Sequence, residues 1–447
     1  MRRRQPQPAE TRWSTRSLVA VGAGAMLENY DWVLYGLLIN QFAPAFFGSG
    51  NHDPLLRGWG VFALGFLARP IGGIVFGRLA DTRGRRSSML WAITAAAAAS
   101  LGIALTPTAD TIGVFAPVAL VCWRLLAGFA MGGELPVAQT YLAELAPDKR
   151  RNLWSSSLYF SGSIGMLGAT GLAMISLHMF PHPVMSGLSW RIPFFIGGVG
   201  GLAALLLRRQ LCESPLFTTP NPRAGPGWGR APTTIIRPML AVAGLTAGVT
   251  SALYIWSTAT TSYATATLGL SKMTALSANG AANILFAITL PIFGLLADRI
   301  GARAVMAGSA GLFAVAGFPL AILLTNATTM RFLGSLLIAT VCLSAMCAVL
   351  PGMLSGLFRT SIRATGQAIP YTLTVSVFGG TAPWLQHLTA RHSVLFAAYL
   401  ALLLVVTAIT AIRTTRLDTT AKNTTHRFEP VRTGTPGHTE AQHPCPD

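Results

Sequence analysis

Long apolar segments separated by short polar breaks run through almost the whole 447-residue chain. The hydrocarbon core of a membrane is about 30 Å thick, and a helix needs roughly 20 apolar residues to cross it. Closely spaced apolar runs of this length favour helices over the alternating strands of a membrane β-barrel. The pattern predicts twelve membrane-spanning helices, near 18–40, 58–80, 87–107, 112–144, 153–178, 191–207, 238–268, 274–297, 304–324, 332–356, 366–390 and 393–412.

Two polar segments interrupt or end this series. The central break is rich in Pro and Gly, which is typical of a linker. The last segment is rich in Thr, Pro and His and lacks periodic apolar residues, which predicts disorder. We therefore expect an N-terminal cytoplasmic segment, a six-helix bundle, a cytoplasmic linker, a second six-helix bundle and a disordered cytoplasmic tail, at 1–17, 18–207, 208–237, 238–412 and 413–447 respectively.

The composition agrees with a membrane protein, and the distribution of its charges predicts the orientation in the membrane. The chain is 52% hydrophobic and 11% charged, whereas soluble domains are about 25% charged. Its net charge is nevertheless +18. Of the Lys and Arg residues, 25 fall in the termini and even-numbered breaks, against 4 in the odd-numbered breaks. The positive-inside rule then predicts that both termini are cytoplasmic, and this dispersal excludes a nucleic-acid-binding patch.

Residues that would support catalysis or metal binding are not clustered in the sequence. The five Cys include no C-x-x-C pair, and the eight His lie near segment ends, in connections or in the tail. A metal centre or a catalytic triad needs a grouping of such residues. We therefore expect no enzymatic activity, no metal and no cofactor.

A short motif occurs once in each half of the chain. The pattern G-x-x-x-D-x-x-G-x-R begins at Gly77, after the second predicted helix, and again at Gly294, after the eighth. Two copies at equivalent positions indicate parallel six-helix repeats, the arrangement of major facilitator transporters. The predicted fold is an all-α membrane protein of two six-helix pseudo-repeats.

Further motifs resemble the metabolite:proton symporter family of that superfamily, which includes proline/betaine, α-ketoglutarate, citrate and shikimate permeases. The first helix contains Glu-Asn-Tyr-Asp-Trp, with Asn29 where the family has Trp. Other matching motifs are Gly65–Gly73, Arg124–Gly128, Gly132–Glu134, Trp190–Phe195, Glu213–Pro215 and Phe378–Pro383. The resemblance implies a carrier that moves a small organic solute by alternating access and uses a proton gradient.

Four charged residues lie near the middle of the N-terminal spans. The rise of about 1.5 Å per residue places Glu28, Arg69 and Arg124 near the membrane midplane, with Asp31 one turn from Glu28. Ionisable residues there cost at least about 2.5–3.5 kcal/mol, so they need a partner or a function. We expect Asp31 or Glu28 to carry the proton, with Arg124 as the counter-ion. A permanent ion pair that only assembles the bundle is the alternative.

Candidate substrate contacts come from the polar residues of both halves. The C-terminal spans carry no interior charge, so their polar residues, among them Tyr254, are candidates, and Asn283 and Tyr371 are preferred. In the N-terminal spans Tyr30 and Arg69 are candidates, although Arg69 has a structural alternative. The four intramembrane charges sum to zero, or to +1 when one carboxylate is protonated, which suits a zwitterion or a monocarboxylate.

The motif residues predict a gate at the cytoplasmic side. The family resemblance implies that Asp81 and Arg85 form a charge latch beside Gly77. Glu134 is expected near them, and Asp298 and Arg303 form the second copy. The alternative is that these charges only set topology.

The combined prediction is a monomeric transporter in the cytoplasmic membrane. We expect import of a small carboxylate or zwitterion by proton symport, and the alternative is proton-coupled efflux of a metabolite or antibiotic. The expected partners are this solute, protons and the lipid bilayer.

Overall fold

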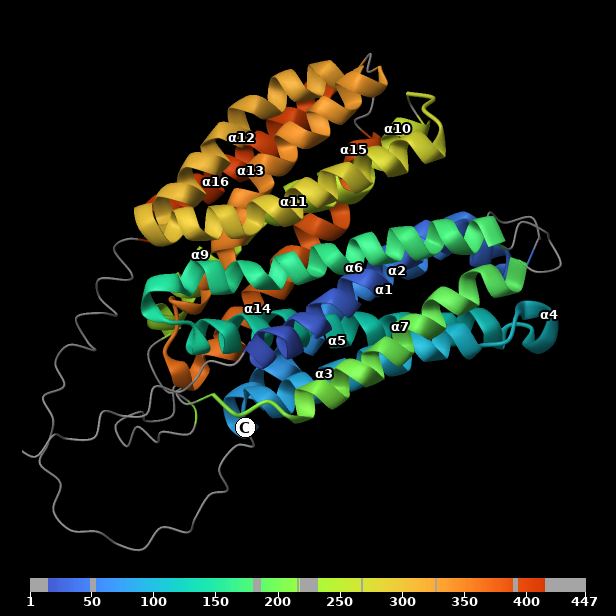
Figure 1. Cartoon of the computed structure of the whole chain (residues 1–447), viewed down its shortest axis with the longest axis horizontal. Helices are drawn as coiled ribbons and strands as arrows, with labels where there is room; N and C mark the ends of the chain where they lie inside the picture. The colour runs from blue at the N-terminus through green and yellow to red at the C-terminus, as the bar shows by residue number, and fades with distance from the viewer. Residues whose placement is uncertain are drawn as a thin grey trace, which may run out of the picture.

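The structure is a computed structural model that describes residues 15–48, 54–179, 186–214, 217, 232–266, 268–325, 328–388 and 393–414. Helices make up almost all of these residues, and no strand occurs among them. Figure 1 shows the helices as two groups of long rods.

The N-terminal half consists of six long helices. A short helix, α4 (Ala109–Ile112), lies before the fourth of them, and the 3₁₀ turn η1 (Asp148–Arg150) before the fifth. The long helices are α1 (Thr15–Phe47), α2 (Pro54–Arg83), α3 (Arg85–Leu105), α5 (Phe115–Leu145), α6 (Arg151–Met179) and α7 (Ser186–Arg209).

The C-terminal half repeats this plan with two interrupted rods. The first is α9 (Pro232–Tyr254), the π turn η4 (Ile255–Ala259) and α10 (Thr260–Ala266). The second is α14 (Arg363–Thr374), the π turn η6 (Val375–Gly379) and α15 (Gly380–Leu388), after the 3₁₀ turn η5 (Thr360–Ile362). The uninterrupted helices are α11 (Lys272–Ile300), α12 (Ala302–Thr325), α13 (Thr329–Ser355) and α16 (Ser393–Arg413).

The twelve predicted spans are confirmed as twelve rods within the described residues. Ten of the described helices are long and apolar enough by themselves to cross a membrane. The other two predicted spans correspond to α1 and to the rod α14–η6–α15. Many large apolar side chains point outward, for example Leu67, Val315 and Leu402. A helix that is apolar all round belongs in lipid or in a core, where its backbone groups must pair within the helix.

Close backbone contacts between the two halves lie at one end of the molecule. There α2 packs against α14, and α6 against α11. A Cβ atom built on Gly77 would lie 2.9 Å from the Thr365 Cα, and one built on Gly294 would lie 2.9 Å from the Leu153 Cα. The first glycine of each motif copy therefore permits backbone contact with the other half. No larger residue fits at either position without a shift.

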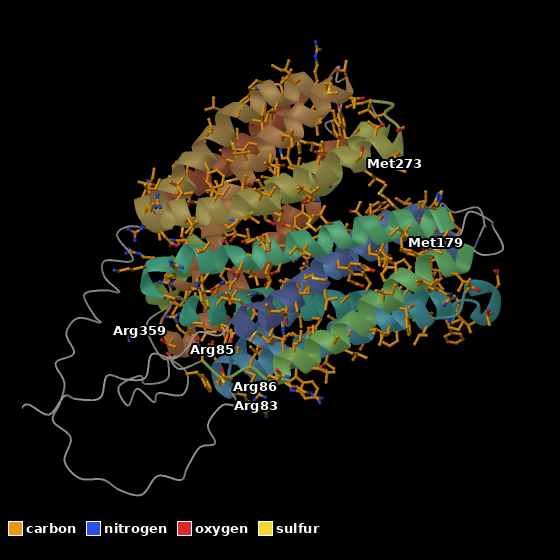
Figure 2. The ribbon with its side chains drawn as sticks, in the orientation of Figure 1. Arg83, Arg85, Arg86, Met179, Met273 and Arg359 are labelled. Atoms are coloured by element: carbon orange, nitrogen blue, oxygen red, sulfur yellow. The ribbon has the colours of Figure 1, made fainter. Side chains whose placement is uncertain are left out.

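This contact end also carries several basic residues, and we call it the basic end. Figure 2 shows Arg83, Arg85, Arg86 and Arg359 there, and Met179 and Met273 at the opposite end. The ribbons of the two halves lie close together at the basic end and diverge toward the opposite end (Figure 1).

Candidate functional site

A cavity lies between the two halves. Its lining comes from α1, α2, α5 and α6 on one side and from α9, α13, α14 and η6 on the other. Arg69 is the only charged residue among the described residues that line it. The uncharged polar lining residues are Asn29, Tyr159, Thr246, Thr250, Tyr254, Tyr371 and Thr372.

Arg69 is held rigidly at this central cavity. Its side chain is 3% exposed, and its guanidinium carbon lies 4.1 Å from the ring centroids of both Trp32 and Phe66. Its Nη1 donates a hydrogen bond to the Tyr254 hydroxyl in the other half, at 2.8 Å. The Nε and Nη2 atoms are buried and have no hydrogen-bond partner among the described residues. Unsatisfied buried donors are costly, so this edge of the guanidinium is suited to bind an acceptor.

The predicted substrate contacts divide into two groups. Arg69 and Tyr371 line the central cavity, and the Tyr371 hydroxyl is hydrogen-bonded to that of Tyr159. Tyr30 and Asn283 do not appear in the described lining. The Tyr30 hydroxyl donates to the Pro193 carbonyl at 2.8 Å, inside the N-terminal half.

Asn283 likewise bonds within its own helix, to the Asn279 side chain at 3.1 Å. The sequence reasoning missed Tyr159 as a contact. Asn29, the departure from the family motif in the first helix, also lines the cavity.

A second cavity lies within the N-terminal half. Glu28, Asp31 and Ser100 line it, and Met131 lines both cavities. The Asp31 Oδ2 lies 3.7 Å from the Arg124 Nη1, and the Ser100 hydroxyl donates to the Asp31 Oδ1 at 2.7 Å. The structure therefore brings together the three residues predicted to handle the proton.

The two carboxylates of this N-terminal cavity differ in their surroundings. Asp31 has a cation and a hydroxyl donor beside it, which stabilise an ionised carboxylate. Both oxygens of Glu28 are buried and lack hydrogen-bond partners among the described residues. An ionised carboxylate is expensive under those conditions. The pocket can therefore hold a neutral Glu28 beside an ionised Asp31.

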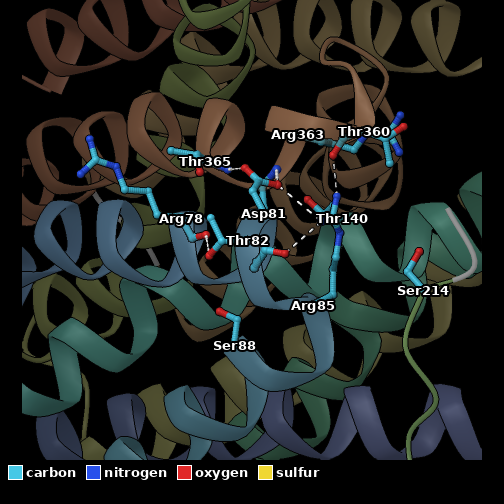
Figure 3. A network of polar contacts seen from close by, with 12 residues as sticks. Arg78, Asp81, Thr82, Arg85, Ser88, Thr140, Ser214, Thr360, Arg363 and Thr365 are labelled. Atoms are coloured by element: carbon cyan, nitrogen blue, oxygen red, sulfur yellow. Dashed lines mark hydrogen bonds and ion pairs between the residues drawn. The ribbon is translucent and has the colours of Figure 1, made fainter. Parts of the chain in front are cut away.

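The basic end is closed by a network of ions and helix ends, which Figure 3 shows. The Asp81 carboxylate, at the end of α2, accepts hydrogen bonds from the backbone N–H groups of Ala364 at 3.1 Å and Thr365 at 2.8 Å. These groups begin α14 in the other half, where the helix dipole favours a negative charge. The Arg85 Nη1 lies 3.5 Å from the same carboxylate.

We call this contact between Asp81 and the start of α14 the first interlock, and Arg85 extends it. Arg85 is fully buried, and its Nη2 donates to the Glu144 carboxylate at 3.1 Å and to the Thr360 carbonyl of the other half at 2.7 Å. The Arg363 Nη1 reaches the same Glu144 oxygen at 3.0 Å. The Ser214 hydroxyl donates to the second Glu144 oxygen. Glu144 therefore joins α5, α14 and the start of the linker.

The second copy of the motif forms a corresponding interlock. The Asp298 carboxylate, at the end of α11, accepts bonds from the backbone N–H groups of Asn152 at 2.8 Å and Leu153 at 3.1 Å. These groups begin α6 in the N-terminal half. The Asn152 side-chain amide donates to the same carboxylate at 2.9 Å. Arg303 lies just beyond this contact, in the first turn of α12.

The prediction that Glu134 lies beside Asp81 and Arg85 differs from the structure. Glu134 forms a buried ion pair with Arg208, at the end of α7. The α5 carboxylate that contacts Arg85 is Glu144, ten residues further along the helix. At about 1.5 Å per residue, these two positions are separated by roughly 15 Å of helix. Both ends of the Glu134–Arg208 pair belong to the N-terminal half.

These features define a class of membrane protein: two helical bundles with a cavity between them and polar contacts at one end are the arrangement of a two-bundle membrane transporter. Comparison with known proteins identifies the family. Residues 21–382 match the family model described as Major Facilitator Superfamily. The chain belongs to this superfamily, and it is a multi-pass membrane transporter of small solutes rather than an enzyme.

Two relatives and two solved structures illustrate the similarity. The alpha-ketoglutarate permease of Escherichia coli (strain K12) is 33% identical over 84% of this chain and 87% of its own. The proline/betaine transporter of the same strain is 29% identical over 96% of this chain and 87% of its own. Among solved structures, the proton:xylose symporter XylE superposes with a TM-score of 0.73 at 18% identity, covering 90% of this chain and 94% of the other. A bacterial homologue of the iron transporter ferroportin gives 0.67 at 14%, covering 90% and 99%.

Proposed function

We propose that this protein imports a small organic carboxylate or zwitterion together with protons, across the cytoplasmic membrane. The observation that carries the proposal is the buried Nε/Nη2 edge of Arg69 at a cavity with no other described charge. A planar guanidinium edge binds a carboxylate through two parallel hydrogen bonds. A cationic solute would be repelled there, and a sugar would leave the charge uncompensated.

The rest of the central cavity suits a small solute. The hydroxyls of Tyr159, Tyr254 and Tyr371 provide polar contacts, and their rings provide apolar surface. Electron-rich rings also favour a quaternary or secondary ammonium group. A zwitterion could therefore place its carboxylate on Arg69 and its cation among the tyrosines. The names of the two relatives, an α-ketoglutarate permease and a proline/betaine transporter, support solutes of these two types.

Proton coupling is assigned to the N-terminal cavity. When Asp31 binds a proton, Arg124 loses its counter-ion and the site gains one positive charge. Exchange of that proton with water, as access alternates, is the expected coupling step. Glu28 lines the same cavity and is the second candidate carrier.

The two interlocks are proposed as the cytoplasmic gate. The positive-inside rule assigns the basic end to the cytoplasm, and the interlocks close that end. Asp81, Arg85 and Gly77 act in the first interlock, and Asp298 in the second. Release of the solute to the cytoplasm requires both helix-end contacts to break.

Transport by purified protein in proteoliposomes tests the proposal. The probes are radiolabelled 2-oxoglutarate, proline and glycine betaine, with xylose as an uncharged comparison. An inward proton gradient should drive accumulation of at least one carboxylate-bearing probe and not of xylose. Faster loss from preloaded vesicles would instead identify the efflux alternative.

Substitution of Arg69 links transport to the cavity. Arg69→Gln should abolish accumulation, and Arg69→Lys should retain only part of it, because an ammonium lacks the two-pronged geometry. Arg331→Gln, at an exposed arginine, is the matched control and should transport like the wild type. Normal carboxylate transport by Arg69→Gln would overturn the proposed binding mode.

A further inference from the structure

Two arginines contact one tryptophan at the boundary between the two cavities. The guanidinium carbon of Arg69 lies 4.1 Å from the Trp32 ring centroid, and that of Arg124 lies 3.8 Å from it. The two guanidinium carbons are therefore within about 8 Å of each other. Arg69 lines the central cavity, whereas Trp32 lines the N-terminal cavity together with Asp31.

Trp32 is well fixed between these charges. Its side chain is 7% exposed, and its ring packs against Phe62 and Phe66 with centroids 4.8 Å apart in each case. Arg124 also contacts the Tyr35 and Phe62 rings, at 4.4 Å and 4.9 Å. Aromatic faces stabilise a guanidinium without neutralising it. Both positive charges therefore remain available to act on each other.

We propose that Trp32 is a positioning residue that couples proton binding at Asp31 to carboxylate binding at Arg69. The inference rests on the proposed function, because it assumes a proton at Asp31 and a carboxylate at Arg69. Trp32 holds both guanidinium groups at a fixed short separation. It also keeps water from entering between them, so their interaction is weakly screened.

The sign of the coupling follows from the charges. With Asp31 ionised, Arg124 is compensated, and Arg69 is the main uncompensated charge. Protonation of Asp31 leaves two arginines close together without compensation, so a carboxylate at Arg69 binds more tightly. By reciprocity, the bound carboxylate favours protonation of Asp31. Proton and solute then bind cooperatively, as symport requires.

The size of the effect follows from Coulomb's law. The two interacting charges are the proton at Asp31 and the carboxylate bound at Arg69. Unit charges about 8–12 Å apart, at an effective dielectric constant near 20, change each other's binding by roughly ten- to thirtyfold. Replacing the indole with a small aliphatic side chain admits water and frees both guanidinium groups. The coupling should then fall toward onefold, although each site still exists.

Other charged groups near Asp31 set the background of this measurement. Glu28 lies on the same helix and Arg124 on α5, and Arg69 approaches from α2. Glu134 on α5 and Arg208 on α7 lie next to Glu28. Within the described residues α3 contributes the uncharged Ser100. Asp31→Asn and Glu28→Gln separate the contributions of the two carboxylates.

Equilibrium binding of the transported carboxylate probe to purified protein, between pH 5 and pH 8, is the test. The wild type should bind roughly ten- to thirtyfold more tightly at the low-pH end. Asp31→Asn should bind tightly at every pH. Trp32→Leu should reduce the ratio of the two affinities to less than about threefold, and Trp32→Phe should restore an intermediate ratio.

Trp256 provides the matched control. It is also buried, at 6% exposure, and its indole nitrogen also lacks a hydrogen-bond partner among the described residues, but it lies in the C-terminal half. Trp256→Leu and Trp256→Phe should keep the wild-type ratio. Because Trp32→Leu could fail to fold, proton uptake on probe binding is also measured with a pH indicator in Trp32→Phe, and it should be smaller than in the wild type.

The outcomes are distinguishable. If Trp32→Leu weakens binding equally at both pH values, or if Trp32→Phe takes up as many protons as the wild type, Trp32 only packs and the inference is wrong. If Arg69→Gln binds the probe normally, the proposed carboxylate site itself is wrong. If Asp31→Asn keeps the full pH dependence, the proton is carried elsewhere.

Discussion

Replacing Asp81 with Asn should shift the transporter toward states in which the basic end is open. The Asp81 carboxylate accepts two backbone hydrogen bonds from the start of α14, at 3.1 Å and 2.8 Å, and pairs with Arg85 at 3.5 Å. The asparagine side chain has nearly the same shape but carries no charge, and it has one acceptor oxygen where the carboxylate has two. Its amide group would face backbone N–H donors or Arg85. The contact between the halves is therefore weakened without loss of volume.

The magnitude can be worked from these contacts. A hydrogen bond to a charged group contributes about 1.5–3 kcal/mol, against about 0.5–1.5 kcal/mol for a neutral pair. Loss of the charge at two such bonds costs about 1–3 kcal/mol of the closed state. That corresponds to a roughly 5- to 150-fold change in the ratio of closed to open molecules.

Distance measurements between two spin labels can detect this shift. Arg83 and Arg359 are exposed, belong to different halves and lie at the basic end, so cysteines at these positions suit a background without the native cysteines. The wild type should give mainly a short distance, and Asp81→Asn should add a longer one. Asp110→Asn, at an exposed residue of α4, is the control. An unchanged distance distribution in folded Asp81→Asn would refute the reasoning.

Two further predictions concern stability within the N-terminal half. Gly72→Ala should lower the thermal unfolding midpoint in detergent, because the new Cβ would lie 1.9 Å from the Phe129 carbonyl oxygen. Gly280→Ala is the control and should leave the midpoint unchanged, because a Cβ there meets open space. Glu134→Gln should cost about 3–5 kcal/mol, because it leaves the buried Arg208 without its counter-ion. A double variant, Glu134→Gln with Arg208→Met, should recover part of that loss. Failure to recover any would show that Arg208 is stabilised mainly by its hydrogen bonds to the backbone carbonyls of Ala20, Val21 and Met89.

The helices could be predicted because the membrane imposes a minimum apolar length on each crossing. The ends were less certain, because a helix continues past the hydrocarbon until its sequence stops it. The first predicted span, 18–40, extends over Thr15–Phe47. The fourth was predicted from 112, whereas α5 begins at Phe115, after the separate helix α4. To choose between the carboxylates of this helix, one needs the depth of each residue in the membrane and the direction of its side chain. Glu134 was predicted at the gate, and the structure shows Glu144 at the first interlock.

The direction of each side chain could not be predicted from the pattern. A membrane helix is apolar on its lipid face and largely apolar on its packing face, so periodicity does not distinguish them. Neighbouring residues differ by about 100° around a helix. Asn29 lines the central cavity, while the next residue, Tyr30, reaches Pro193 in the core of the N-terminal half. Charges were the exception, because Arg69, Arg124 and Asp31 must avoid lipid and so had to face the interior.

The spacing of the repeated motif explains why a glycine and an aspartate occur together in it. Residues four apart lie on one face of a helix, so Gly77 and Asp81 face the same partner, as do Gly294 and Asp298. The glycine lets two backbones meet, and the carboxylate one turn later reaches the N–H groups at the start of the opposing helix. Neither residue works alone, because a side chain at the glycine would hold the carboxylate away.

The two copies are not equal in strength. The first adds Arg85, which bridges Asp81, Glu144 and the Thr360 carbonyl of the other half. The second has Ala302 at the equivalent position, and the Asn152 side-chain amide donates to its Asp298 carboxylate. A charged bridge contributes more than a neutral amide in a buried site. Opening of the basic end should therefore be limited by the first interlock, since the second can separate at lower cost once the first has broken.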